Sequence, residues 1–344
     1  METCELDGEG LGVEWHGYVL GVDLEEAVKG HKRVLVQAPD GLKGFALKVA
    51  EELGGMGVDA FVSGSHAWGG CDVAFGEAER VGATLILHIG HHGPVRFKMP
   101  DTPTVVFAPA YLNRSPAEAL RSAARLASER GYRRVVLGMT VQHVRYLHHA
   151  VAVLEEEGLE AAHFPGPLGI EGLVIGCDYS SLRGGFDAAI IVAAGRFHPL
   201  GAALWTGKPA IAADPYAGSA WEVDAKPYIS RHLYSLSKAV DAESFLVVVS
   251  TKPGQENLRG AEKAAAMLRE AGKKVEIAVF DEVSREALVN LGGFDAYINS
   301  ACPRLVVDDP HLFPGPAVNV GETRFLTSGN VEEWRPRDLF RLYP

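Results

Sequence analysis

Three of the four cysteines lie far apart in the chain, each on a turn preceded by glycine or alanine. They are Cys71 in GGCDVAF, Cys177 in IGCDYSS and Cys302 in SACPRLV. The intervals between them are each about the length of one small α/β domain. Three thiolates from three such domains can meet at one point, hold three irons of a cubane cluster and leave the fourth iron open. An open iron suits chemistry, since a structural cluster usually closes all its positions.

The composition is that of a soluble globular protein. The chain has 344 residues, of which 47% are hydrophobic and 22% charged, so we expect two or three domains. No apolar stretch approaches the ~20 residues that span a bilayer, and the acidic N-terminus lacks the basic region of a secretory signal. We therefore expect a cytoplasmic protein without a membrane partner. In that compartment, few cysteines indicate metal binding or catalysis rather than disulfides.

The charge balance argues against a general nucleic-acid surface. The formal net charge is −11, whereas nucleic-acid-binding domains usually carry a basic face. A local basic patch can still form from Arg335, Arg337 and Arg341 in the C-terminal WRPRDLFRLYP. The simpler interpretation is a solvated tail, and we predict no direct nucleic-acid partner.

The elements that must position the cysteines form a threefold internal repeat. Each repeat opens with a β-branched run: KRVLVQAPDGL from Lys32, RRVVLGMTVQH from Arg133 and SFLVVVSTKPGQ from Ser244. A helical pattern follows, ends at a glycine and leads into a second and a third strand. A fourth strand follows in the first two repeats, with the weaker PAVNVGE in the third. Apolar runs alternating with helices indicate parallel sheets built from βαβ units.

The predicted fold is α/β, with three tandem related domains around a central iron–sulfur site. Each domain is expected to be a mostly parallel sheet flanked by helices, with the cysteines near the carboxyl ends of strands, where ligands gather. The predicted boundaries are an N-terminal segment 1–30, domains 31–128, 129–241 and 242–320, and a tail 321–344.

Rare glutamines and motif histidines add candidate site residues. The three glutamines, Gln37, Gln142 and Gln255, each lie at or just after the first strand of a repeat. At least one is expected to face the site, although a glutamine-poor chain can also retain a few by accident. The histidines match no zinc motif. We expect packing or capping roles for most of them, and keep a site-facing role open for those in the motifs, which are His91, His143 and His198.

Nine short segments occur in an order that resembles a known family. They are QAPDGL (37–42), GGCD (69–72), IGHHG (89–93), TVQH (140–143), IGCDYS (175–180), FHPLG (197–201), DPY (214–216), KPGQ (252–255) and ACPR (301–304). Together they resemble the archaeal diphthamide-synthesis family, 2-(3-amino-3-carboxypropyl)histidine synthase. The resemblance implies three related α/β domains, a homodimer and a 4Fe-4S cluster held by Cys71, Cys177 and Cys302. Cys4 has no counterpart in the pattern.

The resemblance also implies an unusual radical reaction. In this family the reduced cluster passes one electron to S-adenosylmethionine and breaks the bond between sulfur and the methionine γ-carbon. The 3-amino-3-carboxypropyl radical adds to C2 of one histidine of translation elongation factor 2, and methylthioadenosine remains. This is the first step of diphthamide biosynthesis, and its electron donor is unidentified. Ordinary radical enzymes carry three cysteines in one tight loop, which this chain lacks.

Which carbon–sulfur bond of S-adenosylmethionine breaks then depends on which carbon lies closest to the open iron. The main catalytic task of the protein is therefore to position S-adenosylmethionine. Gln255 and Arg259, at the start of the third repeat's helix, are candidates to hold the methionine end of S-adenosylmethionine, and share a helix face if that helix starts early. Further candidates are His198 and Asp214, at strand ends of the second repeat, and Gln37.

Three other interpretations compete with this one. The first is a quinolinate-synthase-like dehydratase, which also carries a 4Fe-4S cluster on three dispersed cysteines. The motif contexts GGCD, IGCDYS and ACPR favour the diphthamide family, and release of methylthioadenosine would separate the two. The second is a non-catalytic subunit that binds the elongation factor or relays electrons, which would not need an open iron. The third treats the cysteines as buried apolar residues.

Overall fold

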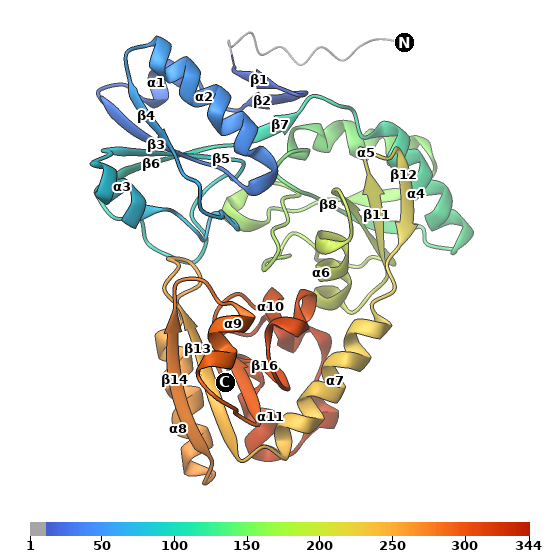
Figure 1. The fold of residues 1–344 in the computed structure, drawn as a ribbon. Helices are drawn as coiled ribbons and strands as arrows, with labels where there is room; N and C mark the ends of the chain where they lie inside the picture. Colours follow the sequence, from blue (N-terminus) through green and yellow to red (C-terminus); the bar gives the residue numbers. More distant parts are fainter. Residues whose placement is uncertain (1–11) are drawn as a thin grey trace. The chain divides into compact units, whose positions relative to one another are not determined.

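The computed structural model describes residues 12–344, so Cys4 lies outside the described residues (Figure 1). The chain divides into two compact units, a first unit up to Arg114 and a second unit from Ser115 to Pro344. The predicted first domain falls mainly in the first unit, and the other two fall in the second. Among the described helices, none has the length and apolar character needed to cross a membrane.

The first unit is built on a four-stranded parallel sheet, the first sheet, in the order β4-β3-β5-β6. Its helices cover both faces: α2 packs over one with Phe45 and Val49, and α3 over the other with Ala78. A small antiparallel sheet, β1-β2-β7, completes the unit. The elements are β1 (Glu14–Trp15), β2 (Tyr18–Leu20), α1 (Leu24–Ala27), β3 (Arg33–Gln37), α2 (Lys43–Gly55), β4 (Asp59–Val62), α3 (Phe75–Val81), β5 (Leu85–Ile89), β6 (Thr104–Ala108) and β7 (Ala110–Leu112).

The second unit begins with the second sheet, in the order β12-β11-β10-β8-β9. Its strands are parallel except β12, which runs antiparallel to β11. The elements are α4 (Ala117–Glu129), β8 (Arg134–Met139), α5 (Leu147–Glu156), β9 (Glu160–Ala162), β10 (Ala188–Val192), α6 (Phe197–Thr206), β11 (Ala210–Asp214), β12 (Ser219–Glu222) and α7 (Lys226–Val240).

The third sheet completes the second unit as four parallel strands in the order β14-β13-β15-β16. Helix α8 covers one face with a stripe of buried, mostly small residues at helical spacing, from Gly260 to Leu268. The elements are β13 (Ser244–Ser250), α8 (Leu258–Glu270), β14 (Lys274–Phe280), α9 (Arg285–Asn290), β15 (Ala296–Asn299), α10 (Arg304–Asp308), β16 (Ala317–Asn319) and α11 (Thr323–Ser328).

The predicted α/β repeat is confirmed at the level of topology. In all three sheets the first strand of the repeat lies between the second and the third, and the fourth follows the third. The weakest prediction, PAVNVGE, forms β16, which pairs parallel with β15. Apolar strands buried on both faces are typical of such sheets, because helices cover each side.

Two predicted boundaries differ from the packing. We predicted a boundary after residue 128, but α4 lies in the second unit, because its apolar stripe, which includes Leu120 and Ala127, packs against the second sheet. Residues 321–344, predicted as a tail, contribute Phe325, Trp334 and Leu339 to a core shared with the second and third sheets. These apolar side chains are spaced irregularly between polar residues, so they showed no clear period in the sequence.

Candidate functional site

The loop that carries Cys71 follows β4 and is fastened by Gln37, the last residue of β3. Gln37 is 1% exposed. Its amide nitrogen donates to the carbonyl of Asp72 at 2.8 Å, and its amide oxygen accepts from the backbone N–H of Ala74 at 3.1 Å. Cys71 itself is half-buried. The side chain predicted to contact S-adenosylmethionine therefore holds the backbone just after Cys71, and both ends of its amide are engaged.

Two histidines extend this contact into a buried chain. The amide oxygen of Gln37 lies 2.9 Å from Nδ1 of His88, and Nε2 of His88 lies 2.8 Å from Nδ1 of His91. Since Gln37 presents its oxygen to His88, Nδ1 of His88 must donate, its Nε2 must accept, and Nδ1 of His91 must donate in turn. Burial lowers the pKa of His88 well below its usual range, and burial together with His92 lowers that of His91 to about 4. Both rings are therefore neutral near pH 7.

A glycine next to Cys71 allows this loop to lie against the histidine turn. A Cβ built on Gly70 would stand 2.0 Å from the carbonyl oxygen of Gly93. The same pair of segments is joined by the Val95 N–H, which donates to the Gly70 carbonyl at 3.1 Å. Because the obstructing atom is backbone, a side chain at position 70 requires the loop to move.

The loop that carries Cys177 is a tight hairpin in the second unit. Ile175 and Asp178 exchange two backbone hydrogen bonds of 3.1 Å, which places half-buried Cys177 in the turn between them. A Cβ on Gly176 would come within 2.5 Å of the Phe197 ring at the start of α6. The glycine before the cysteine therefore permits the hairpin to lie on the amino end of α6.

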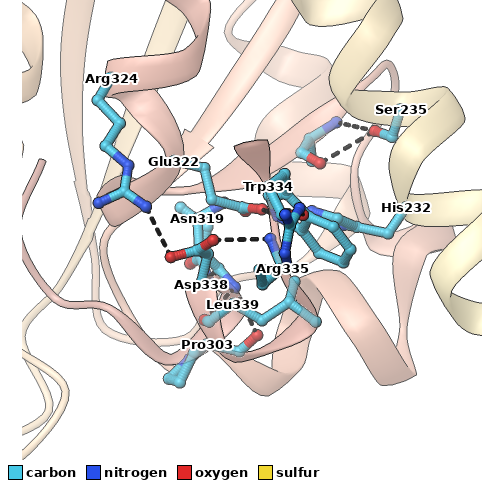
Figure 2. Close-up of polar contacts among 12 residues, drawn as sticks. His232, Ser235, Pro303, Asn319, Glu322, Arg324, Trp334, Arg335, Asp338 and Leu339 are labelled. Carbon is cyan, nitrogen blue, oxygen red and sulfur yellow. Dashed lines mark hydrogen bonds and ion pairs between the residues drawn. The ribbon is translucent and has the colours of Figure 1, made fainter. Parts of the chain in front are cut away.

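The loop that carries Cys302 follows β15 and is held by two buried asparagines. Asn299 donates to the Cys302 carbonyl at 2.9 Å and to the side-chain oxygen of Asn319 at 2.7 Å. Asn319 in turn donates to the carbonyls of Pro303 at 3.0 Å and Leu339 at 2.9 Å (Figure 2). Strands β15 and β16 and the C-terminal segment thus fix this loop together.

Buried polar contacts hold the C-terminal segment in place around β16. The carboxylate of Glu322, which is fully buried, accepts from Trp334 Nε1 at 2.5 Å and lies 2.7 Å from Nε2 of His232 (Figure 2). Its second oxygen accepts from the Asn319 N–H at 2.7 Å. These contacts join α7, the end of β16 and the segment after α11, and they hold the backbone N–H of Asn319, the residue whose side chain supports the Cys302 loop.

Arg304 connects the Cys177 and Cys302 loops. It follows Cys302 by two residues and is 3% exposed. Its guanidinium donates to the carbonyls of Gly176 at 3.2 Å and Phe197 at 2.7 Å and to the Tyr179 hydroxyl at 2.9 Å. Its remaining face pairs with Asp308, with bonds of 2.6 and 2.9 Å. One guanidinium therefore fixes the separation of two predicted ligand loops.

Apart from Gln37 in the first sheet, the residues predicted to contact S-adenosylmethionine lie near the carboxyl edges of the second and third sheets. Asp214 ends β11, and its carboxylate accepts from the N–H groups of Gly195, Tyr216 and Ala217 at 3.3, 2.8 and 3.3 Å. It therefore ties the turn after β11 to the loop before α6. His198 is the second residue of α6 and is half-buried.

Gln255 and Arg259 do not share a helix face. Helix α8 begins at Leu258 and is capped by Asn257, whose side-chain oxygen accepts from the Gly260 N–H at 3.1 Å. Gln255 lies in the preceding turn, half-buried, and Arg259 is exposed in the first helical turn. The two residues could share a face only if the helix began at or before Gln255. Asn257 caps the helix instead, so it begins after Gln255.

His143, the last residue of TVQH, lies buried beyond β8. It is 1% exposed, and its Nδ1 has no hydrogen-bond partner among the described residues. Burial lowers its pKa to about 4, against the opposing effect of Asp214. Its ring meets that of Tyr216 edge-on at 6.1 Å. It is thus a neutral imidazole at the carboxyl edge of the second sheet.

Cys71 belongs to the first unit, and Cys177 and Cys302 belong to the second. Their convergence on one cluster therefore stays a prediction. Within residues 12–344, no group of three or more His, Cys, Asp or Glu side chains has the arrangement of a metal site. The donor chemistry nevertheless fits a cluster, because each sheet supplies one half-buried thiol on a firmly held loop. Sequence reasoning missed Arg304, Asn299 and Asn319, although Arg304 stands in the quoted ACPR motif.

Comparisons with known proteins identify the family of this chain. Residues 38–339 match the family described as "Putative diphthamide synthesis protein". The 2-(3-amino-3-carboxypropyl)histidine synthase of Pyrococcus horikoshii is 33% identical, with 86% of each chain covered, and that of Methanocaldococcus jannaschii is 26% identical, with 90% of this chain and 88% of the relative covered. The crystal structure of Dph2 from Pyrococcus horikoshii with a 4Fe-4S cluster matches with a TM-score of 0.81 and 32% identity, covering 91% of this chain and 90% of that one. This chain therefore belongs to the diphthamide synthesis protein family.

Proposed function

We propose that this chain is a 2-(3-amino-3-carboxypropyl)histidine synthase, which carries out the first step of diphthamide biosynthesis. Relatives that bear this name align over most of both chains. The observation that carries the proposal is the placement of Cys71, Cys177 and Cys302, one beside each of three equivalent sheets, on loops fastened by buried side chains.

In this proposal the three cysteines hold a 4Fe-4S cluster and leave one iron open. Bound and reduced, such a cluster supplies the electron that cleaves S-adenosylmethionine at the bond between sulfur and the methionine γ-carbon. The protein's own part is positioning. Gln37 fixes the backbone after Cys71, Arg304 fixes the Cys177 hairpin relative to the Cys302 loop, and Asn299 fixes the Cys302 carbonyl.

The co-substrate would lie at the carboxyl edges of the sheets. Arg259 is exposed in the first turn of α8, where a guanidinium can pair with the methionine carboxylate. Gln255 and His198 offer further polar groups, and Asp214 shapes the loop before α6 through its three backbone contacts. Gln37 would act through the Cys71 loop rather than by contact with the co-substrate.

The partners follow from the same proposal. The protein substrate would be translation elongation factor 2, whose histidine C2 accepts the 3-amino-3-carboxypropyl group. The enzyme would work in the cytoplasm as a homodimer and take its electron from a separate donor.

The decisive experiment combines iron counting with product analysis. The wild type and the variants Cys71→Ala, Cys177→Ala, Cys302→Ala and Cys4→Ala are reconstituted anaerobically. Iron and sulfide are counted, and EPR spectra are recorded. We expect about four irons per chain in the wild type and Cys4→Ala, with loss of the cluster in the other three. Reduced wild type with S-adenosylmethionine should release methylthioadenosine. A loaded enzyme that releases 5′-deoxyadenosine, or neither product, would contradict the proposed reaction.

A further inference from the structure

A basic groove lies in the second unit, away from the carboxyl edges of the sheets. It has a volume of about 880 Å³ and runs between the carboxyl end of α6, the strand β12, the start of α7 and the C-terminal segment around Pro336. Two acidic side chains, Glu222 and Asp224, line it. Its cationic side chains are Arg130, Lys208, Lys226, Arg335 and Arg337. Arg130 pairs with Glu222 at 2.8 Å, and the remaining lining still carries more cationic than acidic side chains in a chain whose net charge is −11.

The groove continues into a second hollow of about 600 Å³, which shares Trp205, Arg335 and Arg337 with it. The added charged lining is Arg324 and Arg341 with the acidic Glu333 and Asp338, and Asp338 lies 2.7 Å from Arg324 and 3.7 Å from Arg341. Figure 2 shows Asp338 between the guanidinium of Arg324 and the backbone of Arg335. The arginines thus lie on a segment that buried contacts hold in place.

Trp205 connects this groove to the interior. The Arg337 guanidinium lies 4.8 Å from the centre of the Trp205 ring. Behind Trp205, the rings of Phe340 and Tyr179 follow at 5.2 and 6.0 Å, and these two rings lie 6.0 Å from each other. Three aromatic rings in mutual contact therefore reach from the groove to a fully buried tyrosine.

Tyr179 links these aromatic rings to the loop that carries Cys177. It stands two residues after Cys177, and its hydroxyl accepts from Arg304 at 2.9 Å. Its hydroxyl end lies against α6 at Gly201, where a Cβ would lie 1.9 Å from the tyrosine oxygen. Helix α6 has ten residues, about 15 Å of length. The groove therefore lies at the far end of α6 from the Cys177 hairpin, with packed aromatic side chains between them.

We propose that this groove docks an acidic one-electron carrier protein, and that Trp205 and Tyr179 form the packed path by which its electron reaches the cluster. The inference rests on the proposed function, since it needs the cluster held by Cys177. The reduced carrier loses one electron and the oxidised cluster gains it, while no bond forms or breaks and no proton moves.

Charge complementarity favours this occupant. An acidic carrier is repelled by the net negative chain and attracted by the groove, so encounter is steered to one orientation. A nucleic acid fits less well, because Asp224 and the Arg130–Glu222 ion pair interrupt the basic track that successive phosphates need, whereas a protein can place its carboxylates beside Lys226, Arg335 and Arg337 alone. A docking site for the protein substrate would use the same charges but has no need of the aromatic path.

The test compares two reductants on the full-length, cluster-loaded enzyme. Reduced plant-type ferredoxin serves as the acidic carrier, and photoreduced deazariboflavin serves as an uncharged reductant. Cluster bleaching is followed by anaerobic stopped-flow absorbance. The double variant Arg335→Glu/Arg337→Glu should lower the second-order rate with ferredoxin about tenfold at low salt, and the defect should shrink as salt rises. The control variant Arg125→Glu/Lys263→Glu, with two exposed residues outside the groove, should reduce at the wild-type rate.

A second variant tests the path itself. Trp205→Leu should slow the plateau rate at saturating ferredoxin without changing the concentration that gives half of it, and Trp205→Phe should restore most of that rate. Reduction by deazariboflavin and iron content should match the wild type in every variant.

Several outcomes would overturn the inference. Wild-type ferredoxin rates in the Arg335→Glu/Arg337→Glu variant would do so. The inference would also fail if this variant, reduced by deazariboflavin, lost only the transfer of the 3-amino-3-carboxypropyl group to elongation factor 2. That result would assign the groove to the protein substrate. Groove-dependent binding of transfer RNA at physiological salt would assign it to nucleic acid. Failure of the proposed function is separate, because the deazariboflavin-reduced wild type would then release no methylthioadenosine.

Discussion

Replacement of Arg304 by methionine should both destabilise the second unit and loosen the cysteine loops. The substitution keeps much of the volume but removes the donors to Gly176, Tyr179, Phe197 and Asp308. Removing one partner of a buried ion pair typically costs about 3–5 kcal/mol. Because the Asp308 side chain is 27% exposed, water can solvate part of its charge, so we expect about 3 kcal/mol.

The assay is urea unfolding followed by tryptophan fluorescence, together with iron counting after anaerobic reconstitution. Arg304→Lys keeps the charge but cannot reproduce the planar set of donors, so it should cost about 2 kcal/mol. Arg125→Met, on the exposed side of α4, is the matched control and should change stability by less than about 0.5 kcal/mol. If Arg304→Lys unfolds at the wild-type midpoint and binds a full cluster, the reasoning that this guanidinium spaces the two loops is refuted.

Three further predictions concern single sites. Gln37→Glu should cost about 1–3 kcal/mol of unfolding free energy at pH 8, because a carboxylate cannot donate to the Asp72 carbonyl; an unchanged urea midpoint would contradict this. Gly70→Ala should lower the thermal midpoint, since its Cβ meets the Gly93 carbonyl, whereas Gly76→Ala, with open space around its Cβ, should be neutral or slightly stabilising; equal midpoints would refute the close approach. The folded pKa of His143, about 4, lies below the unfolded value, so its contribution is complete above about pH 6.5 and falls by about 1.4 kcal/mol per pH unit down to about pH 4; a His143→Gln variant should show a correspondingly shallower loss on acidification.

The sequence predicted the sheets well because their signal is local. A buried parallel strand needs a short β-branched run, and the helix that follows needs a stripe and a terminal glycine, all within one repeat. The strand signal in PAVNVGE was weaker, because β16 contains only two apolar residues, Ala317 and Val318. The segment nevertheless pairs with β15, as the repeat predicts. Local pattern and repeat symmetry together were therefore sufficient for the strand order of the three sheets.

The site was predictable only in part, since its supporting contacts join residues distant in the chain. Cysteine types and turn glycines are visible in sequence, and they indicated the three loops. Arg304, however, contacts Gly176 across 128 positions, and Asn319 contacts Leu339 and Asn299 from a different strand. Gln37 was singled out because glutamine is rare in the chain, yet its hydrogen bond to the Asp72 carbonyl depends on a loop 35 positions later. These polar side chains are buried and hydrogen-bonded to distant backbone, so they support the loops. Burial of a polar residue cannot be deduced from its neighbours in the sequence.

The contact between Asn319 and the Leu339 carbonyl has a consequence for the order of events during synthesis. The Cys302 loop depends on Asn319, and Asn319 depends on a carbonyl twenty residues further along the chain. Domains generally fold from the amino end as the polypeptide emerges from the ribosome. The third thiol therefore reaches its final setting only after residue 339 has left the ribosome, so iron and sulfide would be inserted once the C-terminal segment has packed around β16.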